Sequence, residues 1–256
     1  MGHERIGFIP KTKQWRAIVS QLQGYNEEDA AVAKVASDTL DALRGLYNSL
    51  PYDKSIIASV RFLTILCRYS NDTEKLKVIG IENGSELSMY SLLRGVNQYL
   101  SSESDSLETG KLAKDSLMRA IITYQQVHET NQLSFDSVDS ECIWNGIDSG
   151  AAFCEMARSF VAEFTERNLN YYLERIAASE IRDYSTLISF NHTLKQQSAA
   201  IATHSQEISK LMQSFAAGWY NKHSSEAVPN DKKIIDFLSV TFKKIKEEFR
   251  REGAEQ

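Results

Sequence analysis

The sequence predicts an all-α protein, a multi-helix bundle of about eight or nine helices, and three observations support this fold class. Apolar residues recur at steps of three or four over long stretches, which is the spacing of one face of a helix. The 256 residues include only 3 prolines and 12 glycines, although a fold of many short elements needs frequent turns. The composition is 42% hydrophobic and 25% charged, so the chain can bury a sizeable core.

The longest periodic stretch runs from Leu187 to Trp219 and predicts one long central helix. No proline interrupts it, and its seam consists of Leu187, Phe190, Leu194, Ser198, Ile201, Ser205, Ile208, Met212, Phe215 and Trp219. At a rise of 1.5 Å per residue, such a helix would be about 50 Å long. Because a rod of that length cannot bury its own apolar stripe, we expect the other helices to pack around it.

The N-terminal part predicts three further helices with clear start and stop signals. Residues 12–24 and 26–50 carry apolar residues at helical spacing, and acidic residues occupy the first turn of the second helix. A third helix begins at Asp53 and continues to Cys67 with nearly unbroken apolar character, so we expect it to be central. Arg61 interrupts this run, and we expect its stem to pack while its guanidinium reaches a carboxylate or the surface.

The middle of the chain contains the least certain element and the clearest internal boundary. Residues 76–84 fit a minor hairpin, and they fit a short helix with a loop equally well. A helix follows from Glu86 to Leu100. The polar stretch 101–106 then predicts a boundary between an N-terminal helical part, 1–102, and a C-terminal helical part, 103–256, with one continuous domain as the alternative.

The C-terminal part adds helices on both sides of the long one. Residues 107–132 predict a helix, 131–150 an ordered acidic loop, and 151–179 a strong helix. After a loop at 224–230, the apolar residues between Ile234 and Phe249 predict a last helix.

The sequence contains no motif that indicates catalysis, a cofactor or a metal ion. The five histidines are scattered, and no glycine-rich phosphate loop or nucleophile motif occurs. Four carboxylates near a tryptophan lack the spacing of a calcium loop, so a solvated loop is favoured over a weak cation site; they are Asp136, Asp139, Glu141 and Asp148. We therefore predict a protein that is not an enzyme. An enzyme whose residues converge only in space, with Asp183, His192 or His204 among them, is the alternative.

Cysteine usage and hydropathy predict a cytoplasmic protein. The three cysteines, Cys67, Cys142 and Cys154, are odd in number and widely spaced, which indicates reduced thiols. The strongest membrane candidate, residues 55–67, is too short to span a bilayer and contains a charge, so no membrane association is expected.

Two groups of residues are candidate binding sites. Phe215, Trp219 and Tyr220 flank small residues and predict a protein-binding spot, with core packing as the alternative. The N-terminal arm carries a local excess of positive charge in a chain of net charge -5, from Arg5, Lys11, Lys13 and Arg16. This arm and the basic residues of the last helix are a candidate nucleic-acid-binding surface.

Two segments also carry a resemblance to a group of known proteins. They are Arg5-Ile6-Gly7-Phe8-Ile9-Pro10-Lys11-Thr12-Lys13-Gln14-Trp15 and Gln213-Ser214-Phe215-Ala216-Ala217-Gly218-Trp219-Tyr220-Asn221-Lys222. Both resemble segments of small helical accessory proteins that are encoded beside bacterial anti-phage ATPases or nucleases. The resemblance implies a non-catalytic subunit that holds or restrains such an effector.

Together these observations predict a non-enzymatic scaffold or adaptor subunit of a bacterial multi-protein complex. Its expected partners are other protein subunits, and the resemblance implies an ATPase or a nuclease in phage defence. The alternative is a nucleic-acid-associated protein that uses the N-terminal arm and the last helix.

Overall fold

The fold is all-α throughout the residues that the computed structural model describes. These residues are 17–18, 20, 38–39, 41, 48–82, 87–104, 107–132, 143–144, 146–180, 184–185, 188, 192, 210, 213–224 and 227–254. The elements with defined bounds are η1 (Leu50–Tyr52), α4 (Lys54–Arg68), α5 (Thr73–Leu76), η2 (Lys77–Ile79), α6 (Met89–Glu103), α7 (Leu107–Gln132), α8 (Gly150–Glu180), α10 (Gln213–His223) and α11 (Asp231–Ala254). None of the described residues lies in a strand, so the predicted all-α class is confirmed for them.

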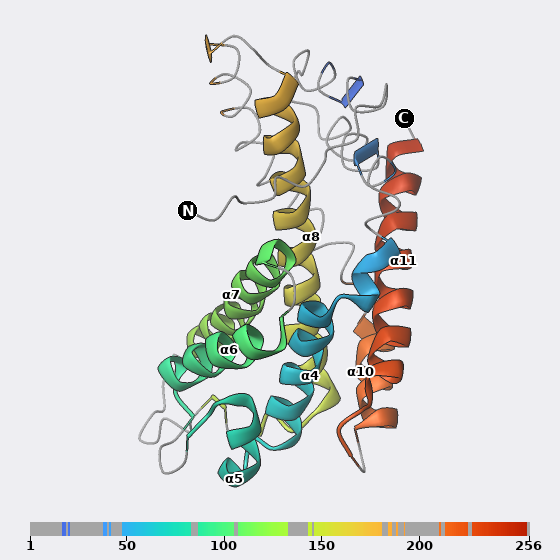
Figure 1. Cartoon of the computed structure of the whole chain (residues 1–256). Coiled ribbons are helices and arrows are strands. Elements are labelled where there is room, and N and C mark those ends of the chain that lie inside the picture. Colours follow the sequence, from blue (N-terminus) through green and yellow to red (C-terminus); the bar gives the residue numbers. More distant parts are fainter. Residues whose placement is uncertain are drawn as a thin grey trace.

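Helix α4 is the centre of the described part of the bundle. It packs against α6, α7, α8, α11 and η1, and all but three of its residues are buried. Figure 1 shows α6 and α7 on one side of α4, with α8 behind it and α10 and α11 on the other side. A helix that is apolar all round has to be enclosed by neighbours, which is what the run from Asp53 to Cys67 predicted.

The start of α4 and the charged residue in its middle, Arg61, have local explanations. The Asp53 carboxylate accepts a hydrogen bond from the backbone N–H of Ser55 at 2.8 Å, which caps the helix. The Arg61 side chain is only 20% exposed and forms ion pairs with Asp231 and, at 3.6 Å, with Glu103. The expectation that its guanidinium reaches a carboxylate is therefore confirmed.

Residues 76–79 are helical, so the structure supports the second of the two alternatives for this segment. Leu76 ends α5, η2 follows directly, and no hairpin forms in the described residues around it. Leu76, Ile79 and Ile81 are buried whereas Val78 is 65% exposed. The buried residues Leu76 and Ile79 are three apart, which is a helical spacing rather than the alternation of a strand.

Helices α7 and α8 correspond to the helices predicted at 107–132 and 151–179. They form the most extensive contact between two helices in the described part of the chain. Their apolar faces join those of α4, α6, α10 and α11 in one core cluster, to which residues on both sides of position 102 contribute. The predicted rod from Leu187 to Trp219 lies outside the described residues except for scattered positions and its end, which falls in α10. The predicted helices at 12–24 and 26–50 also lie largely outside them.

Candidate functional site

The aromatic group predicted in α10 lies mostly inside the bundle. Trp219 and Tyr220 are 8% and 5% exposed, and both stack on Phe153 of α8, with ring centroids 5.7 and 4.9 Å apart. Trp219 also contacts Phe237 of α11 at 4.7 Å. Two of the three rings therefore serve the core, as the packing alternative expected, and they hold α10 between α8 and α11.

Phe215, the third ring, lies at the boundary between core and solvent. It stacks on Phe237 with a centroid distance of 5.5 Å and an interplanar angle of 7°, and it remains half-buried. The Lys244 Nζ lies 5.2 Å from the Phe215 ring centroid, so a cation covers the ring from α11. Because Phe215 is only half-buried, unlike Trp219 and Tyr220, it is the member of the predicted binding group that a partner can still reach.

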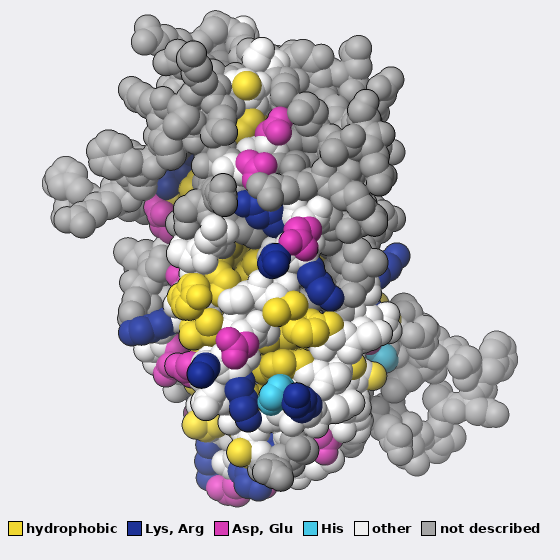
Figure 2. All heavy atoms as spheres, turned by 90° about the vertical axis from the view of Figure 1, so that its right-hand side faces the viewer, with side chains coloured by type: hydrophobic (Ala, Val, Ile, Leu, Met, Phe, Trp, Pro, Cys, Tyr) yellow, Lys and Arg dark blue, Asp and Glu magenta, His cyan; other side chains and the backbone are white. Residues whose placement is uncertain are grey.

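Phe215 belongs to a partly apolar surface, which we call the α10–α11 face. Its members are Phe215 and Gly218 on α10 and Val240 and Lys244 on α11, which lie three and four residues apart on their helices and meet where Lys244 contacts the Phe215 ring. Val240 is 38% exposed, and Phe215 is partly buried. Figure 2, which views the molecule from this side, shows hydrophobic side chains gathered in the middle and charged side chains around them.

Gly218 leaves free space on the surface of α10 within the α10–α11 face, because it has no side chain. It is exposed, and a Cβ added at this position would meet no atom within 4 Å among the described residues. A glycine inside a helix costs about 1 kcal/mol relative to alanine. No packing contact among the described residues requires a glycine at this position. The close approach of another backbone would require one.

Two of the basic residues of α11 have carboxylate partners. Lys243 is 3.7 Å from the Glu247 carboxylate, and Lys246 is turned inward to Asp41 at 3.4 Å with its side chain 10% exposed. This arrangement reduces the positive surface that the nucleic-acid alternative needs from the last helix. The residues predicted for the arm, Arg5, Lys11, Lys13 and Arg16, lie outside the described residues.

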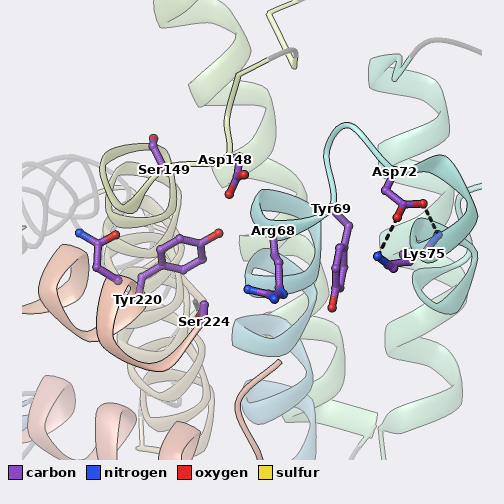
Figure 3. Close-up of a pocket in the computed structure, with 9 residues that line it drawn as sticks. Arg68, Tyr69, Asp72, Lys75, Asp148, Ser149, Tyr220 and Ser224 are labelled. Atoms are coloured by element: carbon purple, nitrogen blue, oxygen red, sulfur yellow. Dashed lines mark hydrogen bonds and ion pairs between the residues drawn. The ribbon is translucent and has the colours of Figure 1, made fainter. Parts of the chain in front are cut away.

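A polar pocket of about 480 Å³ lies on another side of α10, where three distant segments of the chain meet. The end of α4 and the following turn supply Arg68, Tyr69, Asp72 and Lys75, the segment before α8 supplies Asp148 and Ser149, and the end of α10 supplies Tyr220, Asn221 and Ser224. Figure 3 shows these side chains around the pocket. A cavity of this size accommodates a small organic ligand.

Local structure fixes the α4 side of the pocket. The Tyr69 ring lies between two cations, with the Arg68 Cζ 5.3 Å and the Lys75 Nζ 4.9 Å from its centroid. The Lys75 ammonium also forms an ion pair with the Asp72 carboxylate at 2.8 Å. This hydrogen bond with Lys75 is the main cause that lowers the pKa of Asp72.

The α8 side of the pocket is the beginning of a helix. The Ser149 hydroxyl accepts a hydrogen bond from the Ala152 N–H at 3.1 Å and so caps α8. A Cβ at Gly150 would lie 2.5 Å from the Asn221 Oδ1, so glycine lets the Asn221 side chain pack on the first turn of α8. Helix α10 is thereby held close to the start of α8.

Two groups in the pocket wall are neutral hydroxyls. Burial raises the pKa of Tyr220 far above its ordinary value, and the nearby Asp148 carboxylate contributes to this shift, so Tyr220 keeps its proton. Ser224 is only 2% exposed, and its Oγ has no hydrogen-bond partner in the described part of the chain. A buried hydroxyl without a partner costs about 1–3 kcal/mol.

Only one cluster in the described residues places a histidine on a carboxylate. The His128 Nε2 is 3.1 Å from the Glu155 Oε2, and the His128 ring lies tilted against the Tyr124 ring, with centroids 4.2 Å apart. Within the described ranges, no group of three His, Cys, Asp or Glu side chains is placed to hold a metal ion. Asp183 and His204, named for the enzyme alternative, lie outside those ranges, as do Asp136, Asp139 and Glu141.

Sequence reasoning missed the pocket because its nine residues share no local pattern. The sequence places Asp148 only within an acidic loop, and no pattern marks Arg68, Tyr69 or Ser224. The segments 68–75, 148–149 and 220–224 meet only through the packing of α4, α8 and α10.

No helix in the described ranges is both long enough and apolar enough to span a membrane.

When the chain is compared with known proteins, no family model, no curated protein and no solved structure matches it.

Proposed function

We propose that this chain is a non-enzymatic helical adaptor subunit of a bacterial multi-protein complex, and that it binds a partner protein through the α10–α11 face. The observation that carries the proposal is the half-buried Phe215 beside the open surface of Gly218. An aromatic anchor next to a position without a side chain suits a second helix, because helices that pack closely need small residues where their backbones approach.

The surroundings of this face support the same use. The burial of Trp219 and Tyr220 against Phe153 fixes α10, so Phe215 and Gly218 are presented on a rigid support. A pre-organised surface loses little conformational entropy on binding. The setting in phage defence, with an ATPase or a nuclease as the partner, is part of the proposal and comes from the resemblance of the two short segments.

Coexpression with the products of the neighbouring genes tests the proposal. We expect at least one of them to co-purify with the chain, and we expect Gly218→Leu to abolish this, because the added side chain fills the open surface. Since a Cβ at position 218 meets nothing nearby, the variant should keep the fold, which circular dichroism can verify.

Ser102→Leu is the matched control, because it also adds a leucine at an exposed small residue, on α6. It should leave the complex intact. A monodisperse monomer that binds none of the neighbouring gene products would contradict the adaptor function. A complex that survives Gly218→Leu would instead contradict the assignment of the face.

A further inference from the structure

We propose that the α10–α11 face binds an amphipathic helix of the partner protein whose apolar stripe has acidic residues beside it at both ends. This inference rests on the adaptor function proposed above, and it specifies the chemistry of the partner. It follows from the charges around the face, which come from lysines of both helices.

Two lysines from different helices lie at one end of the face. Lys222 is one turn after Gly218 on α10, Lys233 is in the first turn of α11, and both are exposed. Burial and the charges of Lys233 and Lys222 lower the pKa of His223, so both ammonium groups act on the same imidazole. The end of α10 and the start of α11 therefore form one basic corner.

The opposite end of the face carries the third lysine. The Lys244 Nζ lies 5.2 Å from the ring centroid of Phe215, near the start of α10. Lys233 and Lys244 are eleven residues apart, so they lie on the same side of α11 and about 16 Å apart along its axis. Val240 lies between them. We call Lys222, Lys233 and Lys244 the face lysines, and they place positive charge at both ends of an apolar centre.

The carboxylates of these two helices do not neutralise the face lysines. In the described part of α10 and α11 they are Asp231, Asp236 and Glu247. Asp231 forms its ion pair with Arg61, and Glu247 lies 3.7 Å from Lys243, which leaves Asp236. Figure 2 shows Lys and Arg side chains along the border of the hydrophobic area. The surroundings of the face therefore have a net positive charge.

This arrangement of charge favours one occupant over two others. A nucleic-acid backbone would match the lysines, but it would leave Phe215 and Val240 without apolar contacts. A second copy of this chain would bring like charges together, because both ends of the face are positive. An amphipathic helix can place its apolar stripe on Phe215 and Val240, its closest approach at Gly218 and its carboxylates at the lysines.

Fluorescence anisotropy with three labelled helical peptides tests the inference on the full chain. The peptides share one stripe of leucine and alanine, and they carry Glu, Gln or Lys at two positions eleven residues apart beside it. A hydrocarbon staple on the opposite side keeps them equally helical. We expect the Glu peptide to bind about tenfold more tightly than the Gln peptide at low ionic strength, and the Lys peptide to bind most weakly. The ratio should fall as salt is added, because salt screens exposed charges.

Charge-reversal variants assign the lysines. Lys233→Glu and Lys244→Glu should each weaken the binding of the Glu peptide about threefold, and the double variant should prefer the Lys peptide. Both lysines are exposed, so these variants should keep the fold. Lys111→Glu, which reverses an exposed lysine on α7, should leave the affinity unchanged. Gly218→Leu should abolish the binding of the Glu and Gln peptides, which locates them on the face.

Three results would overturn the inference. The first is that no peptide binds, the second is equal affinity for the Glu and Gln peptides, and the third is tighter binding of a labelled DNA duplex than of the Glu peptide. The adaptor function is judged separately by coexpression. A complex that Gly218→Leu abolishes would uphold that function even if the peptides showed no preference for acidic residues.

Discussion

Arg61 in the middle of α4 forms an ion pair with Asp231, the first residue of α11. The two residues are 170 positions apart, and the Arg61 guanidinium also lies 3.6 Å from Glu103 at the end of α6. One arginine thus connects the central helix to two others. Its side chain is 20% exposed, so water screens these interactions less than at the open surface.

Arg61→Ala should lower the free energy of unfolding by about 1–2 kcal/mol, because it removes two ion pairs of a partly buried arginine and the packing of the arginine stem. Urea denaturation measures the change. Arg94→Ala is the control, since Arg94 pairs with Glu82 at 2.7 Å but both side chains are at least half exposed. That substitution should cost less than about 0.5 kcal/mol. Equal losses in the two variants would show that Arg61 acts only as a surface residue.

Phe153→Ala should destabilise the protein by about 3–5 kcal/mol, because it leaves a cavity among packed aromatic rings. Phe153 is fully buried and contacts Trp219, Tyr220 and Phe237. Urea denaturation gives the loss, and tryptophan fluorescence should change as the environment of Trp219 loosens. Tyr90→Ala removes a ring that is 77% exposed and should change stability by no more than about 0.5 kcal/mol. A small effect of Phe153→Ala would contradict the described core.

Gly218→Ala should raise the free energy of unfolding of the isolated chain by about 0.5–1 kcal/mol, since alanine is the better helix former and its Cβ has free space.

Gly95→Ala should instead lower the free energy of unfolding. A Cβ at that position of α6 would lie 2.9 Å from the backbone oxygen of Ile79 and 3.0 Å from the Ile81 side chain. We expect a loss of about 1–3 kcal/mol from this overpacking. Thermal unfolding of both variants distinguishes a glycine needed for internal packing from one that is not.

Cys67 and Cys154 should react slowly with a thiol reagent at pH 8 while the protein is folded. Burial is the main cause that raises the pKa of both thiols, and the Asp148 carboxylate adds to the effect at Cys67. A raised pKa lowers the fraction of thiolate, which is the reactive form. Measurement in a Cys142→Ser background should show slow reaction of both thiols in buffer and rapid reaction in urea.

The raised pKa values of the two thiols also determine how the stability of the fold changes with pH. The unfolded chain releases the thiol protons near their ordinary pKa of about 8.5, whereas the folded chain retains them. The contribution of these groups to stability is therefore full below that pH and is lost as the pH rises above it. Rapid labelling of Cys67 in the native protein would contradict its complete burial.

The sequence was most informative where one periodic pattern ran without interruption. The helix predicted at 107–132 is α7 with the same bounds, and the helix predicted at 151–179 differs from α8 by one residue at each end. The continuous apolar character of α4 correctly indicated its central position. In each case the number and spacing of apolar residues were sufficient to predict the helix and its buried face, because burial of a helix face depends on these features.

The sequence was least informative where the outcome depended on distant neighbours. The apolar residues near Ile79 allowed a strand or a helix, and the exposure of Val78 distinguishes the two only after folding. The aromatic residues of α10 did not reveal which of them face inward, since that depends on Phe153 and Phe237. The pocket was not predicted because Arg68, Asp148 and Ser224 become neighbours only when three segments meet.

The most direct test of the central claim is hydrogen–deuterium exchange of the full chain, alone and in complex with the partner that co-purifies with it. If the partner docks on the α10–α11 face, backbone exchange in 213–223 and 231–247 should become slower in the complex. Exchange in α6 should remain the same. A stable complex in which exchange slows elsewhere and stays unchanged in α10 and α11 would contradict the claim.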